Sequence, residues 1–275
     1  MRTLRTALVT SLSLVMVACG DAAPTTVERP TGVGELVVRV HTAGGLLPPL
    51  ERERQLPEIS IYGDGLVLVP APLRDIFPGP AGYALQSFRI EADLLDDIVA
   101  DAVAIGLRGP DRYLEQEGPE FVADAGATTV TVVTDGSPHV TTADVLFDET
   151  TSQERQLLAE FVSKLHELQT GAGDLAISEP SRLRVYIAAP DPGFGPDVEL
   201  GDEVAWPFAE PLASWGEPMP PDGLSVDVRC RVVEGDELDA ALPVLQFATS
   251  ATIVVSGDER RILAHRPLLP DEDGC

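Results

Sequence analysis

The chain of 275 residues is strongly acidic, with 45 Asp and Glu against 19 Lys and Arg and a formal net charge of −26 at pH 7. Its hydrophobic fraction of 44% suits one or two globular domains and excludes a disordered chain. Three cysteines are too few for a small disulfide-knotted protein. Because the negative potential repels phosphate backbones and anionic lipid, we expect no nucleic-acid binding.

The N-terminus has the pattern of an export signal. Arg2 and Arg5 form a short basic region, residues 7–18 are apolar, and Cys19 follows at once. The apolar run is shorter than the roughly 20 residues that a transmembrane helix needs. We therefore interpret residues 1–18 as a secretory signal peptide.

The end of this apolar run indicates lipid modification. The segment 16–20, MVACG, resembles a bacterial lipobox, in which a signal peptidase cuts before the cysteine and the cysteine thiol carries diacylglycerol. We expect Cys19 to become the first residue, modified with acyl chains such as palmitate and anchored to the outer face of the cell membrane. The alternative is an ordinary cleavage site, for example after Ala22 or Ala23, which would discard Cys19.

Residues 19–34 are rich in Pro, Thr and Gly and poor in large apolar side chains, which predicts a flexible tether between the membrane and the folded protein. Removal of residues 1–18 deletes two arginines and no acid, so the net charge changes from −26 to −28. We expect the folded body to stand away from an anionic membrane.

Two cysteines remain in the exported chain, Cys230 and Cys275. An unpaired thiol is a liability in an oxidising compartment, so we expect these two to form a disulfide. The alternative is a pair of free thiols. A zinc site is not indicated, because the two cysteines are far apart and no histidine pair lies near either one.

Alternating β-branched segments separated by Gly and Asp predict antiparallel hairpins. The clearest case is 59–69, which is two runs joined through Gly63-Asp64-Gly65. Two further hairpins are predicted over 128–146 and 251–265, and single strands over 34–41, 183–188 and 224–233.

Apolar residues recur with a helical period over 91–105, 152–169 and 236–248. Thr151 and Glu154 have the spacing of a capping box at the start of the second helix, and Gly171 would close it. Pro243 should kink or shorten the third helix, because proline lacks the backbone donor.

The resulting order of elements predicts an α+β fold, with a mainly antiparallel sheet built from hairpins and about three packed helices. The Pro-rich acidic segment 191–221 separates a block over 35–175 from a smaller block over 180–275. Because the smaller block is short for an independent core, we favour a core shared between the two and stapled by the disulfide.

No catalytic motif is visible. The chain has no G-x-S-x-G elbow, no Walker loop, no H-E-x-x-H helix and no S-x-x-K motif. We expect structural rather than catalytic or metal-binding roles for the four scattered histidines, and we expect no cofactor and no metal. These histidines are His41, His139, His166 and His265.

One aromatic cluster stands out in the Pro-rich segment and comprises Trp206, Phe208 and Trp215. These side chains could form a stacking platform that contacts a sugar, a peptide or a protein partner. The interpretation we favour is that they anchor their own loop on the sheet.

The same segment contains an acidic group whose oxygens could bind calcium. It lacks the D-x-D-x-D-G spacing of a preformed calcium loop, so we favour a solvated run of charges. The residues concerned are Asp191, Asp197, Glu199, Asp202 and Glu203.

Several segments resemble a group of uncharacterised actinobacterial cell-envelope lipoproteins. They are VVRVHTAGGLLPP at 37–49, LPEISIYGDGLVLV at 56–69, VADAGATTVTVVTDG at 122–136 and RPLLPDEDGC at 266–275. The resemblance implies an export signal, a hairpin built on Tyr-Gly-Asp-Gly and a C-terminal cysteine that pairs. It carries over no catalytic residue.

The function we favour is a lipid-anchored, non-enzymatic protein that binds an envelope protein or a cell-wall component at the outer face of the membrane. The alternative is an extracellular hydrolase whose residues converge only in the folded protein. A solute receptor for a transporter is a weaker hypothesis, because the chain lacks two lobes rich in βαβ units.

Overall fold

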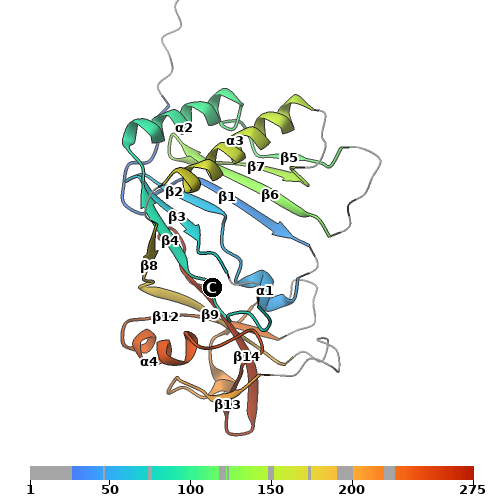
Figure 1. Ribbon diagram of the computed structural model, residues 1–275, viewed down its shortest axis with the longest axis vertical. Helices are drawn as coiled ribbons and strands as arrows, with labels where there is room; N and C mark the ends of the chain where they lie inside the picture. Colours follow the sequence, from blue (N-terminus) through green and yellow to red (C-terminus); the bar gives the residue numbers. More distant parts are fainter. Residues whose placement is uncertain are drawn as a thin grey trace, which may run out of the picture.

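The computed structural model describes residues 27–45, 47–73, 76–117, 122, 124–147, 152–172, 175–190, 201–219 and 227–275. The described chain forms two mixed sheets, mostly antiparallel, with helices packed against them (Figure 1). The predicted α+β class and the mainly antiparallel pairing are therefore confirmed. The two parallel pairs are β5 with β7 and β10 with β13.

The first sheet has eight strands in the order β5-β7-β6-β1-β2-β3-β4-β8. Their bounds are β1 Leu36–Gly44, β2 Ile59–Tyr62, β3 Leu66–Pro70, β4 Leu85–Arg89, β5 Arg112–Leu114, β6 Gly126–Thr134, β7 Ser137–Asp144 and β8 Ala176–Ser178. The β2–β3 turn requires glycine at position 65, where φ is +79° and a Cβ would lie 2.4 Å from the Ile90 carbonyl oxygen. The sequence signal for this hairpin thus has a steric cause.

Helices α2 (Ala92–Ala104) and α3 (Gln153–Gly171) lie together over one face of this sheet (Figure 1). Their apolar stripes, which include Leu95, Ile98 and Leu165, pack on the inward side chains of the strands. The predicted start of α3 needs correction. Its N-cap is Ser152, whose hydroxyl accepts a hydrogen bond from the Arg155 backbone N–H, and Thr151 lies outside the described residues.

The second sheet has six strands in the order β10-β13-β14-β9-β12-β11. Their bounds are β9 Arg182–Ala188, β10 Glu203–Ala205, β11 Glu217–Pro218, β12 Val228–Glu234, β13 Ile253–Ser256 and β14 Glu259–Pro267. Helix α4 (Gly235–Leu245) packs on one face, and the short helix α1 (Pro49–Glu53) brings Leu50 against the other. A 3₁₀ turn, Leu212–Ser214, precedes β11.

The expected shortening of the third helix occurs: α4 ends at Leu245, two residues after Pro243 and three before the predicted end. All three predicted hairpins form, as β2–β3, β6–β7 and β13–β14. Strand β4 and helix α1 were not predicted. In Leu85–Arg89 only Leu85 is buried. The segment therefore lacks the alternation of apolar and polar residues by which a strand is recognised in a sequence.

Each sheet has its own buried cluster, and a smaller cluster joins the two halves. In that smaller cluster, Tyr62 and Leu85 from the first sheet pack against Leu269, which follows the last strand. The chain also crosses between the halves at residues 79–83, which hydrogen-bond to β14 and to the segment before β13. Ala81 N–H donates to the Ala248 carbonyl at 2.9 Å, and His265 N–H donates to the Ala81 carbonyl at 3.1 Å.

Arg155 is a buried cation that holds α3 to the sheet. It is 1% exposed, and its guanidinium donates hydrogen bonds to four backbone carbonyls at the ends of β5 and β7. These acceptors belong to Leu114, Glu115, Asp144 and Val145. The arginine therefore satisfies carbonyls that the strand ends leave without ladder partners.

We expect Arg155→Met to lower the free energy of unfolding by about 3 kcal/mol or more, because it leaves buried carbonyls without donors. The measurement is urea unfolding followed by circular dichroism. Arg108→Met is the matched control, since Arg108 forms a partly exposed pair with Asp135 at 2.7 Å and should cost at most about 1 kcal/mol. Similar losses for the two variants would contradict this role of Arg155.

Candidate binding site

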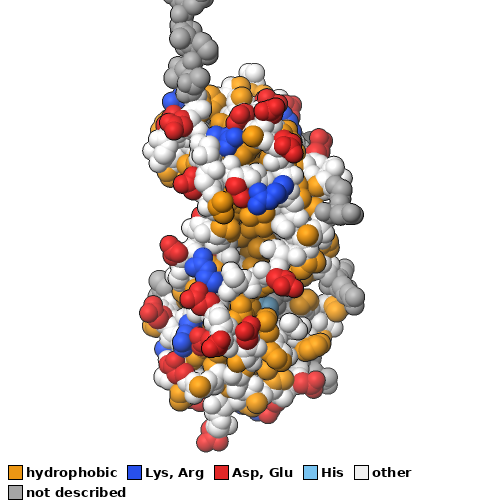
Figure 2. All heavy atoms as spheres, turned by 90° about the vertical axis from the view of Figure 1, so that its left-hand side faces the viewer, with side chains coloured by type: hydrophobic (Ala, Val, Ile, Leu, Met, Phe, Trp, Pro, Cys, Tyr) orange, Lys and Arg blue, Asp and Glu red, His pale blue; other side chains and the backbone are white. Residues whose placement is uncertain are grey.

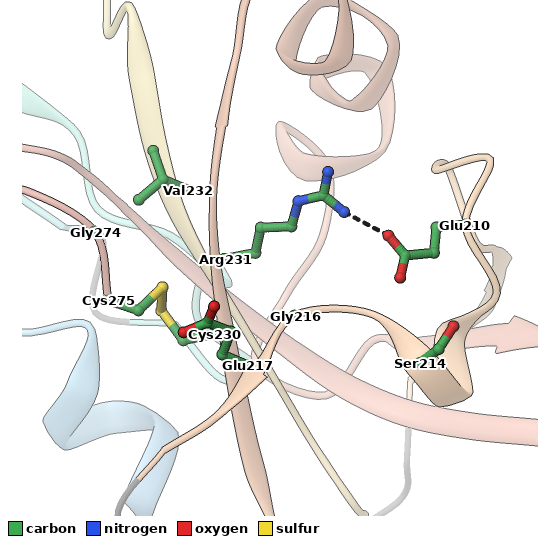
Figure 3. Close-up of a pocket in the computed structure, with 9 residues that line it drawn as sticks. All are labelled: Glu210, Ser214, Gly216, Glu217, Cys230, Arg231, Val232, Gly274 and Cys275. Atoms are coloured by element: carbon green, nitrogen blue, oxygen red, sulfur yellow. Dashed lines mark hydrogen bonds and ion pairs between the residues drawn. A yellow bond between two sulfur atoms is a disulfide. The ribbon is translucent and has the colours of Figure 1, made fainter.

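Cys230 and Cys275 form a disulfide, with an S–S distance of 2.11 Å and a sequence separation of 45. Cys230 lies in β12 and is fully buried, whereas Cys275 is exposed. The bond joins the strand to the segment that follows β14 (Figure 3). The disulfide that we predicted, on the ground that free thiols are a liability in an oxidising compartment, is therefore confirmed.

The segment 268–275, which we call the tail, contacts both sheets. Glu272 accepts two hydrogen bonds from the Arg266 guanidinium, at 2.7 and 3.0 Å, and Arg39 of β1 donates to Asp271 at 2.7 Å. Burial would raise the pKa of Glu272, but its hydrogen bonds with Arg266 outweigh burial and hold that pKa below its usual value. Asp271 also accepts from the Tyr62 hydroxyl at 3.0 Å. The tail thus ties the first sheet to the second.

We expect the double substitution Cys230→Ser with Cys275→Ser to lower the free energy of unfolding by up to about 4 kcal/mol, because the disulfide closes a loop of this length in the unfolded chain. Chemical denaturation with and without reductant measures the effect. Reductant should destabilise the wild-type protein and leave the double variant unchanged. A wild-type protein whose stability is the same with and without reductant would contradict the prediction.

A groove of about 390 Å³ runs beside the disulfide, lined in part by Gly216, Glu217 and both cysteines. In Figure 3, Arg231 and Glu210 point toward each other across it, 2.7 Å apart. Arg231 also approaches Glu237 at 3.4 Å. Because the guanidinium in this groove is already neutralised by carboxylates, the groove is not built to attract an anionic ligand.

The three aromatic side chains of the Pro-rich segment pack on one another and on the second sheet. Ring centroids lie 4.8 to 5.2 Å apart, in edge-to-face and stacked arrangements. Trp215 is fully buried and Phe208 is 8% exposed, while Trp206 is partly exposed and its indole N–H donates to the Glu210 carbonyl. Trp206 is therefore the member of this cluster that solvent reaches.

One histidine contacts the Glu58 carboxylate, and the charge of this carboxylate also acts on a second histidine. His166 Nε2 lies 2.8 Å from Glu58 Oε2, and Thr42 also hydrogen-bonds to Glu58. Burial would raise the pKa of Glu58, but the hydrogen bonds from His166 and Thr42 lower it below its usual value. Burial lowers the pKa of His41, against the attraction of nearby Glu58. The carboxylate thus connects α3 with the strands, which is a structural role.

The remaining histidines bind backbone carbonyls. His139 Nδ1 lies 2.9 Å from the Gly109 oxygen, and His265 Nε2 lies 3.2 Å from the Leu245 oxygen. A Cβ at Gly82 would lie 1.9 Å from the His265 ring, so glycine is required there for the crossing segment to approach β14. Burial lowers the pKa of His265 to about 4, and the hydrogen bond with Leu245 opposes this shift.

We expect the free energy of unfolding to fall as the pH drops from about 6.5 to about 4, because unfolded His265 takes up a proton that the folded form does not bind. The loss should reach roughly 3 kcal/mol, and His41, whose pKa is also lowered, adds to it in the same direction. Urea unfolding across this pH range measures the slope. His265→Phe should reduce the dependence of the unfolding free energy on pH. An unchanged pH dependence in that variant would show that other groups cause it.

The other predicted sites fall partly outside the described chain. Cys19 lies outside it, as do Asp191, Asp197 and Glu199 of the acidic segment, while Glu203 pairs with Arg260. Within the described ranges, no three His, Cys, Asp or Glu side chains come together as metal ligands.

An apolar pocket of about 260 Å³ lies between α1 and β14, and we call it the waist pocket. Its first wall comes from α1 and the β3–β4 loop, and its second from β14 and the turn before β13. The side chains that line it are mostly aliphatic or aromatic. The lining comprises Pro48, Leu50, Glu51, Arg54, Phe77, Gly79, Ala81, Ser250, Ile262, Leu263 and Ala264.

Arg54 is the cation of this pocket and is 5% exposed. Its Nε donates to Glu51 Oε2 at 2.9 Å, its Nη2 also donates to Glu51, and its Nη1 donates to the Pro80 carbonyl. The guanidinium lies 4.7 Å from the centre of the Tyr83 ring, and the Tyr83 hydroxyl donates to Glu51 at 2.9 Å. The pair is electrically neutral and held rigidly by its neighbours.

The rim of the waist pocket is exposed and apolar. Phe77, which lines it, is 76% exposed, and its neighbour Ile76 is 59% exposed. On the left-hand side of Figure 1, away from α1, Figure 2 shows further hydrophobic side chains at the waist, between the charged side chains of the two halves. Exposed aromatic side chains beside a concave apolar surface are typical of binding sites.

Sequence reasoning did not find this pocket. Leu50 and Arg54 lie in a helix of five residues and its C-cap, and Phe77 lies in an irregular loop. Ser250 and Ile262 are about 200 residues away along the chain. The one available signal was Ile76-Phe77 before Pro78, two large apolar residues in a loop rich in Pro, Ala and Gly.

The comparisons with known proteins add no assignment: no protein family, curated protein or solved structure matches the chain. In the part of the chain that the structure describes, no helix is long and apolar enough to span a membrane.

Proposed function

We propose that the protein is a lipid-anchored extracytoplasmic binding protein. It is held at the outer face of the membrane by a lipid on Cys19 and binds an envelope protein or a wall component without chemical turnover. The signal pattern of residues 1–18 supports export, and the Cys230–Cys275 disulfide fits an oxidising compartment. The resemblance to actinobacterial envelope lipoproteins points in the same direction.

The observation that carries the binding proposal is the waist pocket with its exposed rim. Phe77 and Ile76 leave apolar surface in water beside a concave apolar lining, and such surface is stabilised when a partner covers it. Two of the histidines do not favour turnover, because His139 and His265 bind backbone carbonyls. A catalytic histidine would instead face a nucleophile or a substrate.

Charge indicates the kind of partner. Each Lys or Arg in the described chain contacts a protein carboxylate or carbonyl; Lys164 with Asp101 and Arg229 with the Trp215 carbonyl are examples. Over the whole chain, acidic side chains exceed basic ones by 45 to 19. The resulting negative potential favours a partner with a basic surface.

We expect Cys19→Ala to release the protein from membranes into the soluble extracytoplasmic fraction, because the substitution removes the acylated thiol. Cell fractionation with immunoblotting measures the release. Ala23→Ser is the matched control, since it changes a neighbouring position and leaves the lipobox intact. Membrane retention of the Cys19→Ala protein would refute the anchor, and release of both variants would indicate an ordinary cleavage site.

The binding proposal is tested by crosslinking the native protein in cells and identifying the attached molecules by mass spectrometry. Reproducible enrichment of one basic envelope protein or of a wall glycan, lost when salt is added before crosslinking, is the expected result. A protein without crosslinked partners, together with hydrolysis in a broad substrate screen, would overturn the proposal in favour of an extracellular hydrolase.

A further inference from the structure

We infer that the waist pocket binds a peptide segment of a basic partner: one apolar side chain enters the pocket, and Arg54 donates a hydrogen bond to a backbone carbonyl of that segment. This inference rests on the proposed binding function and specifies its site and its ligand chemistry.

The size of the pocket selects one side chain. Pockets for drug-sized ligands and cofactors measure about 300 to 1,000 Å³, and the waist pocket has about 260 Å³. Its lining is aliphatic on the β14 side, with Ile262, Leu263 and Ala264, and aromatic at Phe77. A leucine-sized or phenylalanine-sized group matches this lining, and burying such a group is favourable.

Arg54 supplies the polar contact. A guanidinium has five N–H donors, and three donate to Glu51 and Pro80 among the described residues. The other two are on Nη1 and Nη2, in a side chain that is 93% buried and lines the pocket. Every guanidinium nitrogen of Arg54 already donates one hydrogen bond, so a ligand carbonyl that reaches Nη1 or Nη2 adds a further hydrogen bond to a group that its neighbours hold in place.

Because Arg54 and Glu51 compensate each other, we expect the hydrogen-bond acceptor of the ligand to be uncharged. Glu51 compensates Arg54 within the pocket, so a ligand carboxylate would add an unpaired negative charge in a protein that is already acidic. A backbone carbonyl accepts a hydrogen bond without that cost. A peptide residue combines the two required groups, a carbonyl and an apolar side chain, within one short unit.

The negative charge of the protein favours a basic peptide over a lipid as the ligand. An acyl ester also combines a carbonyl with apolar carbon, but an anionic membrane repels a chain with a net charge of −26. A peptide with lysines on both sides of its apolar residue is attracted by the same charge. The exposed surfaces of Phe77 and Ile76 can then pack on the aliphatic stems of those lysines.

The test uses the purified Cys19→Ala protein, which keeps the whole folded body, and the acetylated, amidated peptide Lys-Lys-Phe-Lys-Lys. Its two comparison peptides carry Ala in place of Phe, or Glu in place of every Lys. Titration followed by NMR of the methyl groups of Leu50, Ile262 and Leu263 measures affinity and location together. We expect the Phe peptide to shift these methyl signals and to bind about tenfold or more tightly than either comparison peptide.

Substitutions in the protein locate the site. Ser250→Phe should fill the pocket and abolish the shifts, while its backbone N–H can still donate to the Gly79 carbonyl. Phe77→Ala removes an exposed wall and should weaken binding severalfold. Phe147→Ala is the matched control, because Phe147 is also exposed, at 60%, and follows β7 in the first sheet. Circular dichroism and thermal unfolding confirm that each variant is folded.

The outcomes separate this inference from the proposed function. Equal affinity for the Phe and Ala peptides, or peptide binding that survives Ser250→Phe, overturns the pocket assignment. If cellular crosslinks also persist in the Ser250→Phe protein, the binding function stands and its site lies elsewhere. Binding to neutral phosphatidylcholine vesicles that Ser250→Phe abolishes, without peptide binding, would overturn the peptide in favour of an acyl ligand.

Discussion

The attachment of the tail to both sheets is the constraint on which the rest of the structure depends. The buried Arg266–Glu272 pair fixes the tail to β14, Asp271 reaches Arg39 and Tyr62 of the first sheet, and the disulfide holds the tail to β12. A buried ion pair adds little net stability by itself but is costly to break, because separation leaves a charge without its partner. The two halves therefore keep one relative orientation.

The waist pocket forms where segments from distant parts of the chain meet on the second sheet. One wall belongs to α1 and the β3–β4 loop, which come from the first part of the chain but pack on the second sheet, and the other belongs to β14 and the turn before β13. The backbone bonds of residues 79–83 with Ala248 and His265 fix the distance between the walls. The Arg54–Glu51 pair lies within this lining, and its charges compensate each other there.

Charged side chains have different roles at the surface and in the interior of the protein. At the surface, acidic residues exceed the basic ones and shape the approach of a partner, an effect that depends on salt. In the interior, buried cations have structural tasks: Arg155 binds carbonyls at strand ends, Arg266 binds the tail, and Arg54 borders the pocket. The cations thus organise the fold, and the anions set the field that a ligand meets.

The sequence by itself determined the features that depend on local pattern: the hairpins with their Gly-Asp turns, the helices α2 and α3, and the α+β class. It also predicted the disulfide, because an exported chain enters an oxidising compartment and only two cysteines remain to pair with each other. Only the tertiary structure decided the burial of Trp215, the carbonyl contacts of Arg155 and the waist pocket. The pocket residues are distant in sequence and irregularly spaced, so no periodicity links them, and they come together only when α1 and residues 79–83 pack on the second sheet.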